Sequence, residues 1–594
     1  MEYTSKEVYE YISKKSNDPI VEWKKCRLSG QNFPIYQSDL EFYDKVSPTF
    51  EVSEEYAKEF LEKNKDVKNN FEYKDWKLKA KIPTPTLCPE ERYRRRLSFS
   101  NLCNLYKRKD SGSWKWVISI YSPDKPYIVY DYNFWNTYSW PIVEKDVTWD
   151  FNENYQYLIE NTPIPNAQIF NCENSDYTNQ SRNMKNSYMC FWWFIAENCL
   201  YDYLWIYDCV SCVDCDAINN CEFCYDCIKI NHCSWLFHSQ NCSDCANSQY
   251  LINCISCHDC YNCSNMVNKC YCINNKQYSK EKYLNIIKDV KCEDLWDIIY
   301  EWCKQGKSEN CIWNGIYWCK NAIFCDEVAE SKNIKYVVEC TGMEDVYDGL
   351  WSWSKLCVET YIWWNSYHSW MLYNSRYNRE SRYLLYSDNC NNCFWCVWLK
   401  DKSYCIYNKQ YTKEEYNRLV PEIIGNMIRR GQRWEYFDPQ LSYFWYNETV
   451  AMIYYPPFNK HEALKMWYKR SNYEAPLPHV EKNVKWEELP KQWCKIIKEK
   501  KPEILEKILN YAIICEVSKR PFRITKQEIE FYVKHNLPLP TKHPDIRHQE
   551  RLARKDPTIM HLIHCDECGE EMLSVHLPWE WKKILCEKCF YKNK

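Results

Sequence analysis

Four cysteines near the C-terminus carry the clearest chemical signal in the sequence. They form two Cys-x-x-Cys pairs, Cys565 with Cys568 and Cys586 with Cys589, which are separated by seventeen residues. Each pair places two thiolates on one tight turn, and a β-ribbon between the pairs would bring the turns together. Four sulfur ligands in a tetrahedron are typical of structural Zn²⁺ and leave no open coordination position for a substrate. The spacing therefore predicts a structural zinc site in a zinc-ribbon module.

A second, incomplete set of ligands lies just upstream. Cys515, His543 and His548 have side chains that suit Zn²⁺, but the set is one ligand short of a tetrahedron. We keep this second metal site as an alternative hypothesis.

A much longer run of cysteines follows a period of three. From Cys209, every third residue up to Met266 gives twenty positions, and thirteen of them are Cys. The remaining positions are small or apolar: Ile218, Ile230, Leu236, Ser239, Ser248, Leu251 and Met266. A period of three fits neither an amphipathic helix nor an ordinary strand. It predicts a narrow solenoid whose coils turn small side chains toward a thin axis.

The cysteines also repeat every twelve residues, as in the series Cys209, Cys221, Cys233, Cys245 and Cys257. This longer period predicts a parallel β-solenoid with coils of about twelve residues. The thiols are expected to fill its interior, because Cys is small and among the most buried residue types. Binding of soft metal ions and disulfides across the bore are the alternatives.

Basic side chains interleaved with tyrosines gather in each terminal part of the chain. A solvated, self-paired charged surface is the first interpretation of this pattern. Nucleic-acid binding is the alternative, because zinc-ordered basic loops with aromatic neighbours commonly bind phosphate backbones. The candidate residues are Arg92, Arg94, Arg95, Arg96, Lys107, Arg108, Lys109, Arg547 and Arg551.

Asp202, Asp214 and Asp226, followed by His238, recur at intervals of twelve residues. Stacked coils would place these side chains one above another, where like charges repel unless a cation or a reaction uses them. An enzyme that acts through these carboxylates is therefore an alternative function, although Asp is also a common turn residue. We recognise no phosphate loop, dinucleotide fingerprint, nucleophile elbow or HExxH motif. We predict no catalytic residue.

Length and composition favour a cytoplasmic protein of several domains. At 594 residues the chain is too long for one ordinary core, and its net charge of −3 indicates no partner. The start lacks the basic and apolar segments of a signal peptide, and the longest apolar run, 188–196, is about half a membrane span. We expect no membrane partner. In that compartment the 38 Cys would serve metal binding or packing and would not form a disulfide framework.

Two internal duplications define the domain organisation. The terminal parts match at constant offsets, as in the pairs Cys26 with Cys515 and Arg92 with Arg547. The segment CYCINNKQYSKEKY at 270–283 recurs as SYCIYNKQYTKEEY at 403–416, and both copies end in a predicted helix start. Ser279 and Thr412 are the expected N-caps. Where the C-terminal copy has its zinc ligands, the N-terminal copy has Asp110, Ser113, Asp131 and Phe134, so we expect it to keep the ribbon shape without that metal.

The predicted fold class is mostly β with helical inserts: a parallel β-solenoid in two blocks, flanked by duplicated modules of zinc-ribbon or treble-clef type. We expect the second block to slip by one residue near Gly349, and a helix to run from Pro502 to near Ile514. The predicted domains are an N-terminal module with a helical insertion at about 50–80 (1–150), a first block (172–278), a helical insert (279–309), a second block (310–410), a helical and irregular connector (411–500) and a C-terminal zinc-ribbon module (501–594).

Glycine is scarce and tryptophan is abundant. The chain has 9 Gly and 29 Trp, although average usage would give about 40 Gly at this length. Many Trp stand where turn chemistry favours Gly, and Trp114 lies opposite Gly569 in the duplication. We hypothesise that UGA codons, read as Gly in the source organism, are shown as Trp. A truly Trp-rich chain is the alternative.

Several motifs resemble those of a large Cys-rich family from genomes of ultra-small candidate-phylum bacteria. They include NCENSDYTNQSRNMKNSY, IYSPDKPYIVYD, YNKQYTKEEY, CEVSKRPFRITKQEIEFYVK and the closing zinc ribbon, so that the resemblance covers nearly the whole chain. Several of these bacteria read UGA as Gly. The resemblance implies no activity, but it implies native Gly at Trp395, Trp398, Trp434, Trp445 and Trp467.

Taken together, the patterns predict a non-enzymatic, zinc-binding solenoid scaffold. Rigid repeats present long side surfaces, so we expect the partner to be a protein or a nucleic acid, including RNA. The alternatives are an enzyme that uses Asp202, Asp214 and Asp226, and a protein that stores soft metal ions.

Overall fold

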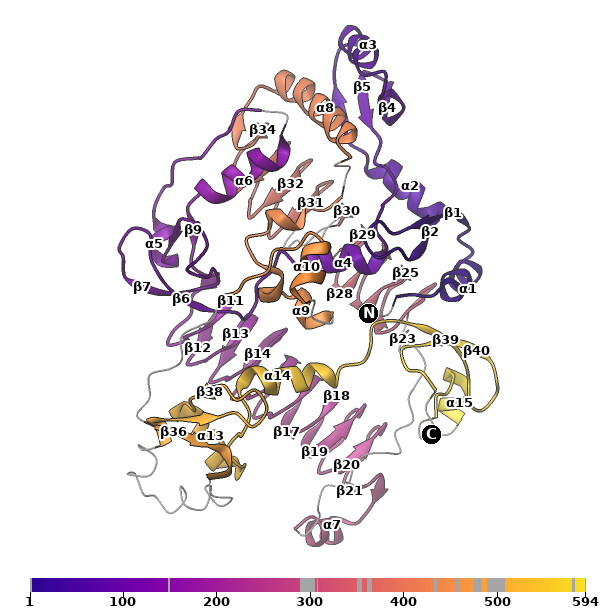
Figure 1. Ribbon diagram of the computed structural model, residues 1–594. Helices are drawn as coiled ribbons and strands as arrows, with labels where there is room; N and C mark the ends of the chain where they lie inside the picture. Colours follow the sequence, from indigo (N-terminus) through magenta and orange to yellow (C-terminus); the bar gives the residue numbers. More distant parts are fainter. Residues whose placement is uncertain are drawn as a thin grey trace.

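The computed structural model describes residues 3–147, 150–288, 305–306, 308–349, 355–359, 366–431, 435–455, 459–473, 482–488, 508–578 and 583–592. Short parallel strands stack through most of the molecule and form a β-solenoid (Figure 1). The predicted fold class is confirmed.

The first block of the solenoid runs from β10 to β22. Consecutive coils pair twelve residues apart, so that Ile218 lies beside Ile230 and Ile230 beside Cys242. The final strand, β22, folds back antiparallel on β21. The strands are β10 (Ile169–Phe170), β11 (Asn179–Arg182), β12 (Met184–Lys185), β13 (Phe191–Glu197), β14 (Ile206–Val210), β15 (Asp216–Asn219), β16 (Ile228–Asn231), β17 (Ser234–Phe237), β18 (Gln240–Ser243), β19 (Ala246–Ile252), β20 (Tyr261–Ser264), β21 (Cys272–Ile273) and β22 (Lys276–Gln277).

The second block repeats this arrangement and ends in the same antiparallel turn, between β34 and β35. Glu344 pairs with Lys355, only eleven residues on, which confirms the predicted slip near Gly349. The strands are β23 (Gln305–Gly306), β24 (Ile316–Tyr317), β25 (Lys320–Ile323), β26 (Asp326–Ala329), β27 (Lys332–Lys335), β28 (Val338–Thr341), β29 (Glu344–Tyr347), β30 (Lys355–Val358), β31 (Trp370–Tyr373), β32 (Arg382–Leu385), β33 (Phe394–Val397), β34 (Cys405–Ile406) and β35 (Lys409–Gln410).

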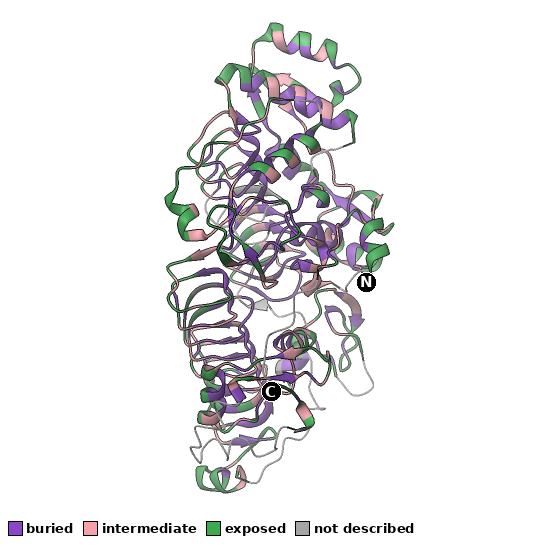
Figure 2. Cartoon of the chain, turned by 60° about the vertical axis from the view of Figure 1, so that its left-hand side comes forward, coloured by how far each residue is buried: buried purple, intermediate pink, exposed green. Residues whose placement is uncertain are grey.

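The predicted three-residue track forms the interior of the first block. Its cysteines are buried together in one cluster, and Figure 2 shows the buried inner side of the coils. The Cys227 thiol donates to the carbonyl of Tyr225 at 3.3 Å and to that of Leu236, in the next coil, at 3.2 Å. Ser239, on the same track, donates its hydroxyl to the Phe237 carbonyl at 2.9 Å. The bore therefore selects small side chains with a hydrogen-bond donor, which explains why Cys and Ser alternate with aliphatic residues there.

Sharp corners produce the period of three. One residue in every three has a positive φ, as in Asp208, Ser211, Asp214 and Asn220. Asn and Asp enter this left-handed region more readily than other side chains, because they hydrogen-bond locally. Many Asn and Asp of the solenoid are therefore corner residues.

Several Trp adopt backbone conformations that normally require Gly. Asp75 and Trp76 have φ values of 51° and 61° and form the two-residue loop between β4 (Phe71–Lys74) and β5 (Lys77–Ala80). Positive φ at both residues defines a type I′ turn, for which Asp-Gly is a preferred sequence. Trp114 has a φ of 57°, and its counterpart Gly569 one of 72°. Many other non-Gly residues of the chain also have positive φ, so the replacement of native Gly by Trp stays a hypothesis, which the intact mass of protein from the source organism would test.

Replacement of Trp76 by Gly is expected to raise the free energy of unfolding of this chain by about 1 kcal/mol. The reason is that a non-Gly residue in the left-handed region costs on the order of 1–3 kcal/mol. Little contact is lost in return, since Trp76 is 68% exposed. Urea unfolding measures the change. Trp116→Gly is the matched control: Trp116 is 58% exposed but lies in β7 without a positive φ. Equal effects of the two substitutions would contradict the backbone argument.

The terminal modules have matching elements. Helices α2 (Gln37–Val46), α4 (Pro89–Leu97) and α5 (Tyr132–Thr137) correspond to α13 (Lys526–His535), α14 (Pro544–Ala553) and α15 (Glu587–Lys592). The remaining strands and helices of the modules are α1 (Lys6–Ser16), β1 (Ile20–Lys25), β2 (Asn32–Tyr36), β3 (Thr49–Glu51), α3 (Glu54–Lys63), η1 (Lys68–Asn70), β6 (Tyr106–Lys109), β7 (Trp116–Ser119), β36 (Lys482–Lys485), β37 (Tyr511–Ile514), β38 (Pro521–Phe522), β39 (His561–His564) and β40 (Glu571–Ser574).

Helix α4 of the N-terminal module packs against the second block of the solenoid, and helix α14 of the C-terminal module packs against the first block. In Figure 1, α4 of the N-terminal module lies beside the second block, and α14 of the C-terminal module crosses the first. Side-chain contacts agree, since Arg92 of α4 pairs with Asp348 and Arg551 of α14 pairs with Asp216.

The connecting helices agree in part with the sequence-based expectations. Ser279 caps α7 (Lys280–Ile286) and Thr412 caps α8 (Lys413–Arg429), as predicted. The prediction that a helix ends near Ile514 is wrong, because this segment is strand β37, which pairs with β36 and β38. The predicted start of that helix, Pro502, lies outside the described residues. Most of the predicted insert after residue 288 also lies outside them. The other elements are β8 (Val129–Tyr130), α6 (Phe151–Asn161), β9 (Ile164–Pro165), η2 (Pro439–Leu441), η3 (Tyr446–Glu448), α9 (Ala451–Tyr454), α10 (Lys460–Lys465) and η4 (Trp486–Glu488).

A search of the described helices finds none with the length and apolar character needed to cross a bilayer.

Candidate metal centre and docking sites of the modules

The four predicted zinc ligands meet at one point. The Sγ atoms of Cys565, Cys568, Cys586 and Cys589 all lie within 4.8 Å of one another, and the Cys568 and Cys586 sulfurs are 3.6 Å apart. Zinc–sulfur bonds of about 2.3 Å in a tetrahedron place sulfur atoms roughly 3.8 Å apart. The cluster therefore fits a metal ion held by four thiolates.

Backbone N–H groups prepare this site for negative charge. Cys586 donates its amide to the Cys565 sulfur at 3.2 Å. Burial alone would raise the pKa of Cys565, but the amides of Cys568, Cys586 and Glu567 hold it at about 6. A thiolate is the form that binds metal.

The ribbon that carries the four cysteines covers one end of the second block. Met560, Leu573 and Val575 share a buried cluster with Trp313 and Ile316, which belong to its first coils. Tyr11 of α1 also donates its hydroxyl to the Glu571 carbonyl, at 3.4 Å. A solenoid needs such a cap, because its terminal coil would otherwise expose its core.

The N-terminal copy has the predicted ribbon shape with different groups at the ligand positions. Asp110 replaces Cys565 and accepts hydrogen bonds from Gly112, Ser113 and Asp131, at 2.9, 2.5 and 2.7 Å. These donors correspond in the duplication to Glu567, Cys568 and Cys586, which donate to Cys565. One carboxylate thus organises the same backbone turn as a cysteine ligand.

The predicted second metal site is wrong. His548 is turned to Asp216, 3.2 Å from its Nδ1, and His543 Nδ1 accepts the amide of Asp545 at 3.1 Å. Within the described residues, the four-cysteine cluster is the single group of three or more His, Cys, Asp or Glu side chains close enough for a metal. Cys515 forms no disulfide, and its sulfur accepts the Ser518 amide at 3.3 Å.

The seven arginines predicted as nucleic-acid-binding residues are all buried, and their role is instead structural. Arg95 donates to the Phe437 carbonyl at 2.8 Å, and Arg108 to the Tyr127 carbonyl at 3.2 Å. A phosphate backbone cannot reach side chains that are buried and paired inside the molecule. The buried set is Arg92, Arg94, Arg95, Arg96, Arg108, Arg547 and Arg551, whereas Lys107 and Lys109 are exposed.

The predicted column of carboxylates forms only from Asp214 onward, because Asp202 does not belong to it. The backbone of Tyr203 forms a parallel β-bridge with that of Asp216, which is thirteen residues further along the chain. The usual spacing is twelve, so this coil contains one additional residue, near Trp205. Asp202 therefore leaves the corner column and is completely buried, where it accepts the Cys215 amide at 2.8 Å. Asp226 pairs with His238 at 2.9 Å and with Arg554. The enzyme alternative loses its proposed residues.

Two corner aspartates are the docking points of the terminal modules. In the C-terminal module, Arg547 and Arg551 both bind Asp214, and Arg551 is 3.1 Å from it. In the N-terminal module, their counterparts Arg92 and Arg96 bind Asp348 at 3.0 and 3.5 Å. Asp214 and Asp348 are buried and have positive φ. Each module thus clasps one solenoid corner with two arginines, one helical turn apart.

The buried carboxyl group of Asp202 makes stability depend on pH. Burial, and then the neighbouring Cys212 thiol, raise the pKa of Asp202 well above its ordinary value. Such a group stabilises the fold fully below its unfolded-state pKa of about 3.9, and this contribution is lost as the pH rises toward the folded-state pKa. Its Oδ2 atom has no hydrogen-bond partner.

Asp202→Asn is therefore expected to be more stable than the parent by about 1–3 kcal/mol at pH 8, with the advantage shrinking toward pH 4. The amide keeps an acceptor for the Cys215 N–H but carries no charge. Urea unfolding across this pH range measures the difference. A parent chain that is as stable as the variant at pH 8 would rule out the buried charge.

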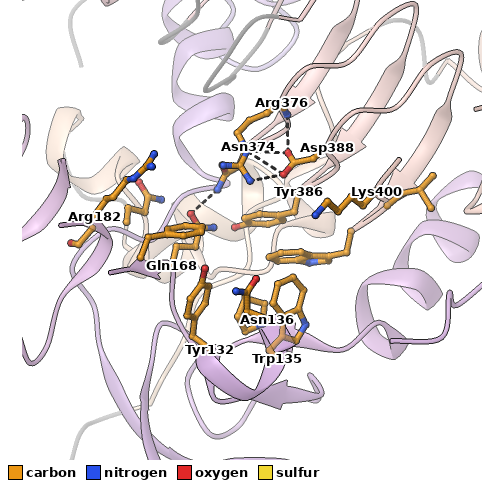
Figure 3. A pocket seen from close by; sticks show the side chains of 16 residues that line it. Tyr132, Trp135, Asn136, Gln168, Arg182, Asn374, Arg376, Tyr386, Asp388 and Lys400 are labelled. Atoms are coloured by element: carbon orange, nitrogen blue, oxygen red, sulfur yellow. Dashed lines mark hydrogen bonds and ion pairs between the residues drawn. The ribbon is translucent and has the colours of Figure 1, made fainter. Parts of the chain in front are cut away.

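A cavity of about 210 Å³ lies where the two blocks meet (Figure 3). Arg376 and Asp388 form an ion pair on its wall, with Arg376 Nε 3.1 Å from each carboxylate oxygen. Asn374 of the second block donates to Gln168, beside β10, at 2.8 Å. The Asn374–Gln168 hydrogen bond crosses the joint, so we interpret this cavity as part of the contact between the blocks.

Comparisons of the chain with protein-family models, with curated proteins and with solved structures found no match.

Sequence reasoning missed Asp348 and Asp110. Asp348 lies next to the slip near Gly349, so its column could not be read from a fixed period. Asp110 aligns with a metal ligand in the duplication, and that alignment was a usable signal for its role.

Proposed function

We propose that this chain is a zinc-stabilised, non-enzymatic solenoid scaffold that binds a protein along the outer face of the first block. The observation that carries the proposal is an exposed column of side chains on that face. Ile195, Tyr207, Ile255 and Val267 are its large apolar members, and each is between 37% and 47% exposed.

Strand pairing aligns this column. Ile195 lies beside Tyr207 and Tyr207 beside Asn219, and the series continues through Asn231 and Ser243 to Ile255 and Val267. Adjacent strands are about 4.8 Å apart, so the column forms a straight ridge. The ends of the column are apolar, whereas its polar centre is half-buried, with the Oδ1 atoms of Asn219 and Asn231 buried. Such a surface suits a partner that makes hydrophobic contacts at both ends.

Zinc is proposed as the metal of the four-cysteine cluster. Its tetrahedral preference and its affinity for thiolates match the four sulfurs. We assign it the role of stabilising the cap over the second block.

A nucleic-acid partner is less favoured. Of the nine basic residues proposed from the sequence, the exposed ones are Lys107 and Lys109. Both lie over the Trp116 ring, at 5.2 and 4.5 Å from its centroid. Two lysines supply little of the multiple phosphate neutralisation that such binding needs.

The test is affinity purification from the source organism with the parent chain and a Tyr207→Lys, Ile255→Lys double variant. We expect specific protein partners of the parent to be lost from the variant. Tyr177→Lys, which changes a 42% exposed residue outside the column, should retain them. Retention by the double variant, or recovery of RNA in place of protein, would refute the proposed partner.

A further inference from the structure

A cavity of about 410 Å³ lies between the N-terminal module, the second block and the segment before β39 that contains Thr558 and Ile559. Aromatic rings form most of its wall. The ring of Phe324 is 5.5 Å from that of Tyr9 and 5.2 Å from that of Tyr336, while Tyr93 meets Tyr455 at 6.1 Å. The lining residues are Thr4, Tyr9, Pro89, Glu90, Tyr93, Trp313, Phe324, Asp326, Tyr336, Val338, Tyr454, Tyr455, Thr558 and Ile559.

Glu90 brings an unneutralised carboxylate to this wall. It is only 8% exposed, and its Oε1 accepts the Thr4 amide at 3.0 Å. Its Oε2 has no hydrogen-bond partner, and no Lys, Arg or His of the described chain forms an ion pair with it. Its charge acts on Tyr9 and Tyr455, where it adds to burial in raising the pKa of each ring hydroxyl. A buried carboxylate without a cation is costly.

The cations nearby have other partners or positions. Arg92 and Arg94 of α4 stack on Tyr336 and Tyr455, but they pair with Asp348 and Glu91 and do not line the cavity. Lys555 lies 5.5 Å from the centroid of the Tyr454 ring and does not line it either.

The duplicated module shows how such a charge is otherwise neutralised. Glu90 corresponds to Asp545, which forms an ion pair with Arg520 at 2.8 Å. The counterpart of Arg520 in the N-terminal module is Gln31. The N-terminal module therefore keeps the carboxylate, as Glu90, but has Gln31 in place of the arginine that would pair with it.

We propose that this cavity binds a small alkylammonium cation, with its charged group at Glu90 and its apolar body between the aromatic rings. Aromatic faces attract cations, most strongly where water is excluded, and ammonium groups are recognised by aromatic cages. Asp326, which is 6% exposed, also lines the cavity, but it acts with Glu327 to raise the pKa of the neighbouring Lys229. The charge of the ligand is therefore assigned to Glu90 alone.

Titration calorimetry with putrescine, spermidine and choline, and with neutral 1,4-butanediol, tests the proposal on the full chain. We expect at least one ammonium probe to bind and the diol not to bind. Glu90→Gln should weaken that binding at least tenfold, whereas Asp545→Asn, the matched change in the other copy, should leave it within twofold.

A second variant tests the role of the aromatic wall and controls for loss of binding through misfolding. Phe324→Leu keeps the wall apolar but removes an aromatic face, so it should weaken binding severalfold while circular dichroism stays unchanged. The proposal is overturned if none of the three cations binds, if the diol binds as well as they do, or if Glu90→Gln binds like the parent.

Discussion

The Arg551→Ala variant is expected to lose about 3–5 kcal/mol of unfolding free energy, because it leaves buried carboxylates without their partner. Arg551 is 1% exposed and binds Asp214 and Asp216, each at 3.1 Å. Its Nη2 atom also donates to the Tyr201 carbonyl at 3.3 Å. Removal of the guanidinium should detach α14 from the first block, and urea unfolding would measure the loss.

Arg554→Ala is the control for this prediction. Arg554 also pairs with a solenoid aspartate, Asp226, but its side chain is 38% exposed. Exposed ion pairs contribute about 0–1 kcal/mol, so this variant should remain close to the parent. Arg96→Ala, the counterpart of Arg551→Ala in the N-terminal module, should be destabilised in the same way. Equal losses for Arg551→Ala and Arg554→Ala would contradict the assigned docking site.

Loss of the metal is expected to unfold the C-terminal ribbon. Binding of structural zinc supplies roughly 10–16 kcal/mol in small metal-dependent domains, and the ribbon has only a small cluster of its own around Ile563 and Phe590. Chelation, or Cys586→Ser, should remove the protection of β39 and β40 against hydrogen exchange. The first coils of the second block, near Trp313, should lose protection with them.

The N-terminal copy provides an internal control. Its turn is held by the Asp110 carboxylate, so β6 and β7 should keep their protection when metal is removed. Cys172→Ser, which changes a half-buried thiol of the first block, should not affect the ribbon. Full protection of β39 and β40 in the Cys586→Ser variant would show that the four thiols are not a structural metal site.

The sequence predicted the solenoid because its geometry is local. Each corner needs a residue that tolerates positive φ, and each inward position needs a small side chain, so the period is visible without knowledge of any distant contact. The four-cysteine cluster was predictable for the same reason, since Cys565 and Cys568 share one turn.

Docking contacts could not be predicted, because they depend on how distant parts pack. The run from Arg92 to Arg96 has the composition of a phosphate-binding surface, and only the partner Asp348, more than 250 residues away, shows that it is internal. Asp202 was misplaced because one additional residue near Trp205 shifts all upstream positions relative to Asp214. A fixed period does not reveal such an insertion.

The central claim is that the solenoid thiols are packing groups and that the metal is confined to the ribbon. Elemental analysis of the purified full-length chain tests it most directly. We expect one equivalent of zinc per chain, and none in the Cys586→Ser variant. More than about two equivalents of zinc or copper, or metal that persists in Cys586→Ser, would contradict the account and favour storage of soft metal ions in the bore.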